Sequence, residues 1–140
     1  MARAGMTVVI DQEFDLPFDG LSDRHFQDID CPGIDVSRPA VLAFRIKPLA
    51  EADVQFRIRQ SRVSATFLTD DSRDPNDDER ERSWLEVIGG GSLTEENNEL
   101  VVSIQPNGRA RVSDIVLFYQ LKPALLPGLG AVFTRRKRKA

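Results

Sequence analysis

The sequence contains few of the cysteine and histidine residues that bind zinc or take part in nucleophilic catalysis. Among its 140 residues, Cys31 is the only cysteine and His25 the only histidine. A single cysteine excludes a disulfide within the chain, as is usual in reducing compartments. A zinc site needs more nitrogen and sulfur ligands, and the sequence has neither a glycine-flanked nucleophilic serine nor a phosphate-binding glycine loop. We therefore expect a protein that is not an enzyme, with no catalytic residue and no cofactor.

Long apolar runs are also missing. No stretch approaches the roughly 20 apolar residues that cross a bilayer as a helix. The N-terminal segment lacks an apolar run long enough for a secretory signal. We therefore expect no membrane span, and a protein that is cytoplasmic or is exported without an N-terminal signal.

Helical periodicity is missing as well, and alternation of apolar and polar residues takes its place. It is clearest in Pro39–Pro48, Asp53–Gln60 and Glu99–Gln120, and it is typical of strands with one buried face. The Asn107-Gly108 pair predicts a β-hairpin within the last of these segments, because both residues tolerate positive φ. The strand that follows is apolar on both faces from Ile115 onward, which favours a central strand covered on both sides.

About eight such strands, at a spacing of roughly ten residues, predict an all-β fold, namely an antiparallel, jelly-roll-like β-sandwich. Residues 1–120 would form this domain. Its expected core consists of Leu42, Phe44, Ile46, Val54, Phe56, Ile58, Leu100, Val102, Ile104, Ile115, Leu117 and Tyr119, together with Phe67 and Val116.

The C-terminal segment differs from the rest of the chain. Leu121–Thr134 holds two prolines and two glycines among apolar residues, which excludes a regular helix or a central strand. Arg135–Lys139 then carries five positive charges, whereas the remainder, with 14 basic and 22 acidic residues, has a net charge of −8. We expect residues 121–140 to form an extended apolar arm and a basic tail, and the tail to be attracted to an acidic surface such as that of a neighbouring copy.

The side chains expected to contact a partner are apolar residues of the arm, cations of the tail, and cations on the outward faces of two successive strands. They are Leu125, Leu126, Leu129 and Phe133; Arg135, Arg136, Lys137, Arg138 and Lys139; and Arg45, Lys47, Arg57 and Arg59. If the two strands are neighbours, the last four cations share one patch; the alternative is an ordinary solvated face. The expected partner is a protein or an identical copy, with carbohydrate as an alternative and nucleic acid less favoured.

The segment Asp70–Ser83 is too charged and too long for a hairpin turn. Its carboxylates form a candidate cation-binding loop, because Ca²⁺ takes about six to eight oxygen ligands, several of them from carboxylates. The candidate ligands are Asp70, Asp71, Asp74, Asp77 and Asp78. The alternative is a solvated loop in which neighbouring arginines such as Arg73 and Arg80 pair with these carboxylates.

Three stretches of the second half follow a recognisable pattern: Trp84-x-Glu86-Val87 before a loop, Asn97-Asn98-Glu99-Leu100 at the start of a strand, and Val112-x-Asp114-x-Val116 in the last strand. Through this pattern, residues 83–119 resemble the C-terminal half of galactose-binding-like domains, the jelly-roll β-sandwiches of the carbohydrate-binding-module type. The resemblance covers about a quarter of the chain and implies the fold.

Trp84 could serve as a platform for a sugar ring. Strand alternation places it on one face with Glu86 and Ile88, which favours a packing role instead. We expect a non-catalytic β-sandwich that acts as a structural or protein-interaction module and contacts a partner or identical copies through its C-terminal arm. The alternative is a small carbohydrate-binding module.

Overall fold

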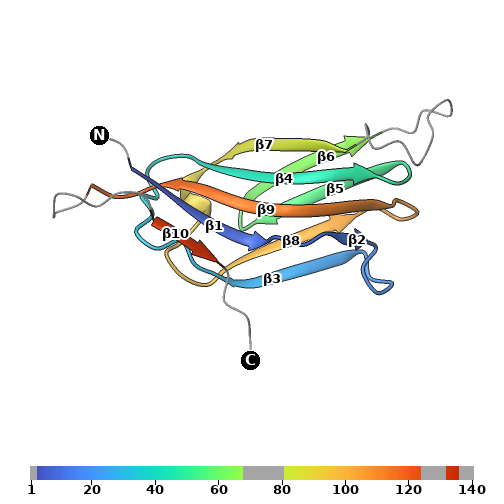
Figure 1. Cartoon of the computed structure of the whole chain (residues 1–140), viewed down its shortest axis with the longest axis horizontal. Coiled ribbons are helices and arrows are strands. Elements are labelled where there is room, and N and C mark those ends of the chain that lie inside the picture. The colour runs from blue at the N-terminus through green and yellow to red at the C-terminus, as the bar shows by residue number, and fades with distance from the viewer. Residues whose placement is uncertain (1–2, 68–80, 124–131, 136–140) are drawn as a thin grey trace.

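The structure is a computed structural model that describes residues 3–67, residues 81–123 and, by their backbone alone, residues 132–135. Two facing β-sheets form a sandwich, as Figure 1 shows. The large sheet has the order β10-β1-β9-β4-β7, with β2 also paired to β9, and the small sheet has the order β3-β8-β5-β6. The expected all-β sandwich is confirmed.

The strands are bounded as follows. The large sheet contains β1 (Ala4–Ile10), β2 (Phe14–Leu16), β4 (Ala40–Pro48), β7 (Arg82–Ile88), β9 (Ala110–Gln120) and β10 (Val132–Arg135). The small sheet contains β3 (Asp23–Ile29), β5 (Ala52–Ile58), β6 (Ser61–Phe67) and β8 (Asn98–Ile104).

The strand order is that of a jelly roll. When β2 and β10 are set aside, the other described strands can be numbered one to eight along the chain. Their order is then 1-8-3-6 in the large sheet and 2-7-4-5 in the small sheet, as two Greek keys produce. The described strand pairs are antiparallel except β1 with β10, which run parallel.

The turn after β8 corrects the predicted hairpin. Because β8 lies in the small sheet and β9 in the large sheet, residues 105–108 carry the chain from one sheet to the other. The Gly108 N–H donates to the Gln105 carbonyl oxygen at 3.1 Å, and Asn107 has a φ of 67°. Pro106 and Asn107 are therefore the two central residues, which suits a type II turn rather than the type I′ turn of a tight hairpin.

The core lies between the sheets and contains the residues that alternation predicted, except Phe67, which is only partly buried, and Val116. Phe44 on β4 stacks on Phe56 on β5 with ring centroids 3.9 Å apart, which joins the two sheets. Phe67 and Trp84 are partly buried and pack against this core. The Trp84 ring centroid lies 6.2 Å from that of Phe44, so Trp84 has the packing role that alternation favoured.

The central strand β9 is covered on one face only. It is a central strand, as predicted, with β1 and β4 as its neighbours, and its inward residues Ile115, Leu117 and Tyr119 are buried. On the opposite face Val116 is half-buried and Phe118 keeps 38% of its surface exposed. The expectation of cover on both sides was therefore wrong for the described residues, and Val116 belongs to an outer surface.

Part of the expected C-terminal arm belongs to the sandwich. β10 pairs with β1, with Val132 opposite Gly5. The Leu121 N–H donates to the Arg3 carbonyl oxygen, and the Lys122 N–H donates to that of Gly33, both at 2.9 Å. Residues 121–122 and 132–135 are thus bonded to the domain that was expected to end at residue 120.

Helical structure within the described residues is limited to the short 3-10 turn Gly90–Ser92. No helix in that part of the chain has the length and apolar character needed to cross a membrane.

Candidate interaction surface

The four strand cations do not form one patch. Arg45 and Lys47 lie on β4 in the large sheet, whereas Arg57 on β5 and Arg59 in the turn after it belong to the small sheet. Successive strands of a jelly roll often lie in opposite sheets, so the two pairs of cations are on opposite sides of the sandwich. The four cations therefore lie at two separate sites and do not share one patch.

Several other predicted site residues lie outside the described part of the chain. These are the candidate cation ligands Asp70, Asp71, Asp74, Asp77 and Asp78, the arm residues Leu125, Leu126 and Leu129, and the tail residues Arg136, Lys137, Arg138 and Lys139. Phe133 and Arg135 are described by their backbone, as part of β10. Within the described ranges, no group of three or more His, Cys, Asp or Glu residues is arranged to hold a metal ion.

Cys31 and His25 lie in different environments. Cys31 is buried, and this burial raises the pKa of its thiol to about 11. His25 lies on the exposed face of β3, where its Nδ1 is 3.7 Å from a carboxylate oxygen of Glu99. The histidine is therefore directed to the surface of the small sheet and the thiol to the interior.

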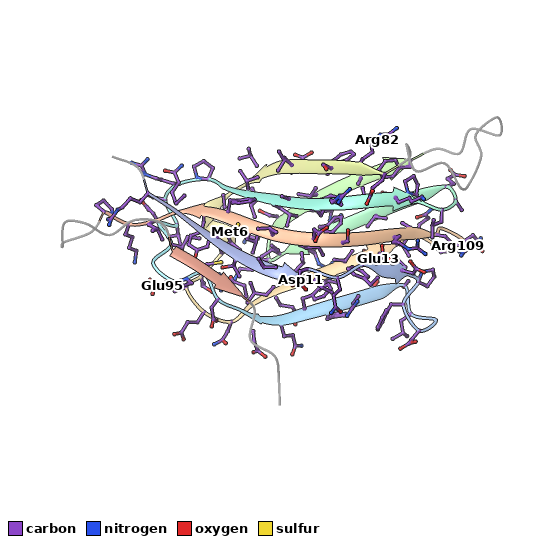
Figure 2. The ribbon with its side chains drawn as sticks, in the orientation of Figure 1. Met6, Asp11, Glu13, Arg82, Glu95 and Arg109 are labelled. Atoms are coloured by element: carbon purple, nitrogen blue, oxygen red, sulfur yellow. The ribbon has the colours of Figure 1, made fainter. Side chains whose placement is uncertain are left out.

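The outward face of the large sheet carries two rows of apolar side chains across four adjacent strands. We call this set the outer apolar face; strand pairing gives the rows Met6, Phe118, Val41 and Val87, and Val8, Val116, Ala43 and Leu85. Leu85 and Val87 are 70% and 69% exposed, and Phe118 is also exposed. The other five side chains are half-buried, namely Met6, Val8, Val41, Ala43 and Val116. Figure 2 places Met6 toward one end of the sheet and Glu13, Arg82 and Arg109 toward the other.

The small sheet shows what an ordinary solvated face looks like in the same sandwich. The corresponding rows across its four strands are Asp23, Ser103, Gln55 and Ser64, and His25, Val101, Arg57 and Arg62. Seven of these eight side chains are polar or charged, as is usual for the water-facing side of an antiparallel sheet. The outer apolar face departs from that rule.

Paired charges border the outer apolar face at both ends of the strands. At one end, Arg45 Nη2 lies 3.0 Å from a carboxylate oxygen of Glu81. At the other end, Arg38 donates to the Gln120 side-chain oxygen at 3.0 Å, and its Nε lies 3.4 Å from Asp35. Hydrogen bonds from Ser37 lower the pKa of Asp35 and so favour its charged form further.

The sequence contains part of the signal for this face. Val41 and Ala43 alternate with the core residues of β4, and Leu85 and Val87 alternate with Trp84 and Glu86. Alternation assigns them to the outward side. Only the register across β1, β9, β4 and β7 shows that these outward apolar residues are neighbours.

A second surface feature lies beside β2. Glu13, Phe14, Asp15, Pro17, Phe18, Asp19 and Arg111 line a shallow depression there. The Arg24 guanidinium lies 4.2 Å from the centroid of the Phe18 ring and 4.6 Å from that of Phe14. These rings therefore already bind a cation of the same chain.

No protein-family model matches the chain, and comparison with curated proteins finds no significant match.

Proposed function

We propose that this protein is a non-catalytic β-sandwich module that binds a protein partner through the outer apolar face. The observation that supports the proposal is the pair of apolar rows across β1, β9, β4 and β7. Four strands at a spacing of about 4.8 Å and two rows about 7 Å apart give a patch of about 250 Å². The largest apolar patch of a monomeric protein, commonly about 300–600 Å², often has a binding function, and the outer apolar face comes close to the lower end of that range.

The C-terminal segment would contribute to the same contact. In the register of β10 with β1, Phe133 is opposite Met6 and Arg135 is opposite Val8. β10 therefore continues both rows by one strand at the backbone level. The arm proposed from the sequence and the outer apolar face proposed from the structure would act as one binding surface.

The alternative function, carbohydrate binding, has less support. Sugar-binding modules commonly stack pyranose rings on exposed aromatic side chains, but Trp84 packs inward against Phe44. Phe18 in the depression beside β2 has Arg24 on its ring. Nucleic-acid binding also has little support, because it favours a continuous basic surface. Here Arg45 and Lys47 lie in one sheet, and Arg57 and Arg59 belong to the other.

Affinity capture from extracts of the source cells tests the proposal. We expect the wild-type protein to retain a partner that the Leu85→Asp variant loses, because a carboxylate in an apolar contact is costly to desolvate. Ser64→Asp is the matched control, since Ser64 is exposed on the edge strand β6 of the small sheet. Equal capture by all three proteins would contradict the proposal.

Truncation tests the contribution of the C-terminal segment. The cut should follow Pro123, because Leu121 and Lys122 are hydrogen-bonded to the body of the domain. The eight jelly-roll strands remain in this variant, so we expect it to fold and to bind the partner more weakly or not at all. Undiminished binding would limit the surface to the four strands of the outer apolar face.

A further inference from the structure

We propose that a second copy of this chain binds the outer apolar face, so that two large sheets stack face to face about a two-fold axis. The inference rests on the proposed function, because it names the partner of that same surface. The axis would lie in the interface and cross the strands near Leu42, between the two apolar rows. In that arrangement the strands of the two copies run in opposite directions.

The composition of the face suits contact with itself. A two-fold contact brings the same patch of both copies together, so a charged residue near its centre would meet its own charge. None of the eight side chains of the outer apolar face is charged. Sheets also stack readily in this way, at about 10 Å with a crossing angle near 30°. The inward side of the large sheet already packs on the small sheet in this sandwich.

The charges at the border favour a second copy over a partner of one strong charge. Each end of the face has both signs, Arg38 with Asp35 at one end and Arg45 with Glu81 at the other. Because the strands of the two copies run in opposite directions, the Arg38 end of one copy lies over the Arg45 end of the other. Each border of the pair then holds two arginines and two carboxylates, so neither border brings together charges of one sign only.

The size and the position of the face set the kind of assembly. About 250 Å² per copy is well below the roughly 800 Å² per partner of a stable interface, so the contact should be weak and dependent on concentration. Because the outward face of the small sheet is polar, only one side of the sandwich offers the contact. The association should therefore stop at a closed pair and not continue into a filament.

Sedimentation velocity of the full chain, from about 10 µM to about 1 mM, tests this directly. We expect the weight-average sedimentation coefficient of the wild type to rise from the monomer value toward that of a dimer over this range. Leu85→Asp should stay at the monomer value, and Ser64→Asp should behave as the wild type. A wild-type protein that is monomeric throughout would overturn the second-copy inference, as would a Leu85→Asp variant that dimerises equally well.

Cross-linking provides a second measurement that does not depend on a charge in the interface. Val87 is exposed, and the native thiol, Cys31, is buried, so Val87→Cys introduces one accessible cysteine. A short bis-maleimide should link two Val87→Cys chains efficiently at high concentration, and should link Ser64→Cys chains poorly. Equal linkage of the two variants would contradict the face-to-face arrangement.

The outcomes separate this inference from the proposed function. If the wild type is monomeric but a captured protein is still lost in Leu85→Asp, the surface binds a different protein and only the second-copy inference fails. If dimerisation and capture are both unaffected by Leu85→Asp, the outer apolar face is not the binding surface and both fail.

Discussion

The side-chain amide of Asn98 donates a hydrogen bond to the backbone carbonyl oxygen of Ile29 at 2.8 Å, in a fully buried position. The same amide donates to the Thr94 carbonyl oxygen at 2.8 Å, and its Oδ1 accepts from the Thr94 N–H at 2.8 Å. One side chain therefore joins the end of β3 to the loop before β8. These contacts satisfy backbone groups that the strand ladder leaves unpaired at this point.

Replacing Asn98 by alanine should destabilise the domain by about 2–3 kcal/mol, because buried carbonyl and N–H groups would lose their partners. Urea denaturation followed by circular dichroism measures the loss. Glu96→Ala, at an exposed position of the same loop, is the control and should change stability by less than about 0.5 kcal/mol. A similar small loss for Asn98→Ala would mean that water replaces the amide.

Phe56→Ala should be among the most destabilising single changes in the core. Phe56 is 1% exposed and stacks on Phe44 across the two sheets, so its removal leaves a cavity at their junction. The expected cost is about 3–5 kcal/mol in the free energy of unfolding. Arg57→Ala, one residue further on the exposed face of β5, should have little effect. Comparable losses for the two variants would be incompatible with the assigned inward face.

Alternation predicted the inward side chains well because successive residues of a strand point to opposite faces whatever the strand pairs with. Leu42, Phe44 and Ile46 on β4 are buried for this reason, as are Val54 and Phe56 on β5. The same pattern contains no information on whether the next strand lies in the same sheet. The sequence therefore left open whether the Arg45 and Arg57 strands are neighbours, and the hairpin at Asn107 was mispredicted for the same reason.

The candidate surface was hidden by a related ambiguity. A strand that is apolar on both faces, as β9 is from Ile115 to Tyr119, needs cover on both sides, and sequence alone does not say who supplies the cover. The small sheet covers Leu117, whereas Phe118 is exposed among its neighbours Met6 and Val41. The proposed function assigns the second cover to another chain.

Gly5→Ala should destabilise the large sheet because the Tyr119 ring lies against Gly5. A Cβ at this position would be 2.5 Å from Cε2 of Tyr119, closer than such atoms can approach. The ring would have to move, and its hydroxyl, which donates to the Pro32 carbonyl oxygen at 3.3 Å, would move with it. We expect a cost of about 1–3 kcal/mol in chemical denaturation.

Two further variants distinguish this clash from a general effect of alanine. Gly91→Ala should be nearly neutral, since no other atom lies within 4 Å of its ideal Cβ position. Adding Tyr119→Leu to Gly5→Ala should cost less than the sum of the two single changes, because the smaller side chain removes the clash. Additive losses would show that the Tyr119 ring is not the cause.

The last prediction concerns Cys31 and alkaline pH. Burial raises the pKa of its thiol to about 11, from 9.0 in an exposed thiol, so between these pH values the folded chain retains a proton that the unfolded chain releases. Stability must then fall as pH rises, and what the neutral thiol contributes below pH 9 is progressively lost toward pH 11. The loss at the upper limit is roughly 2 kcal/mol. Burial also raises the pKa of Tyr119, which adds a decline of the same sign.

Urea denaturation at pH 9 and at pH 11 should therefore show a smaller decrease in stability for Cys31→Ala than for the wild type, with part of the decrease remaining. A decrease of the same size in both proteins would mean that the thiol ionises as readily in the folded chain as in the unfolded one.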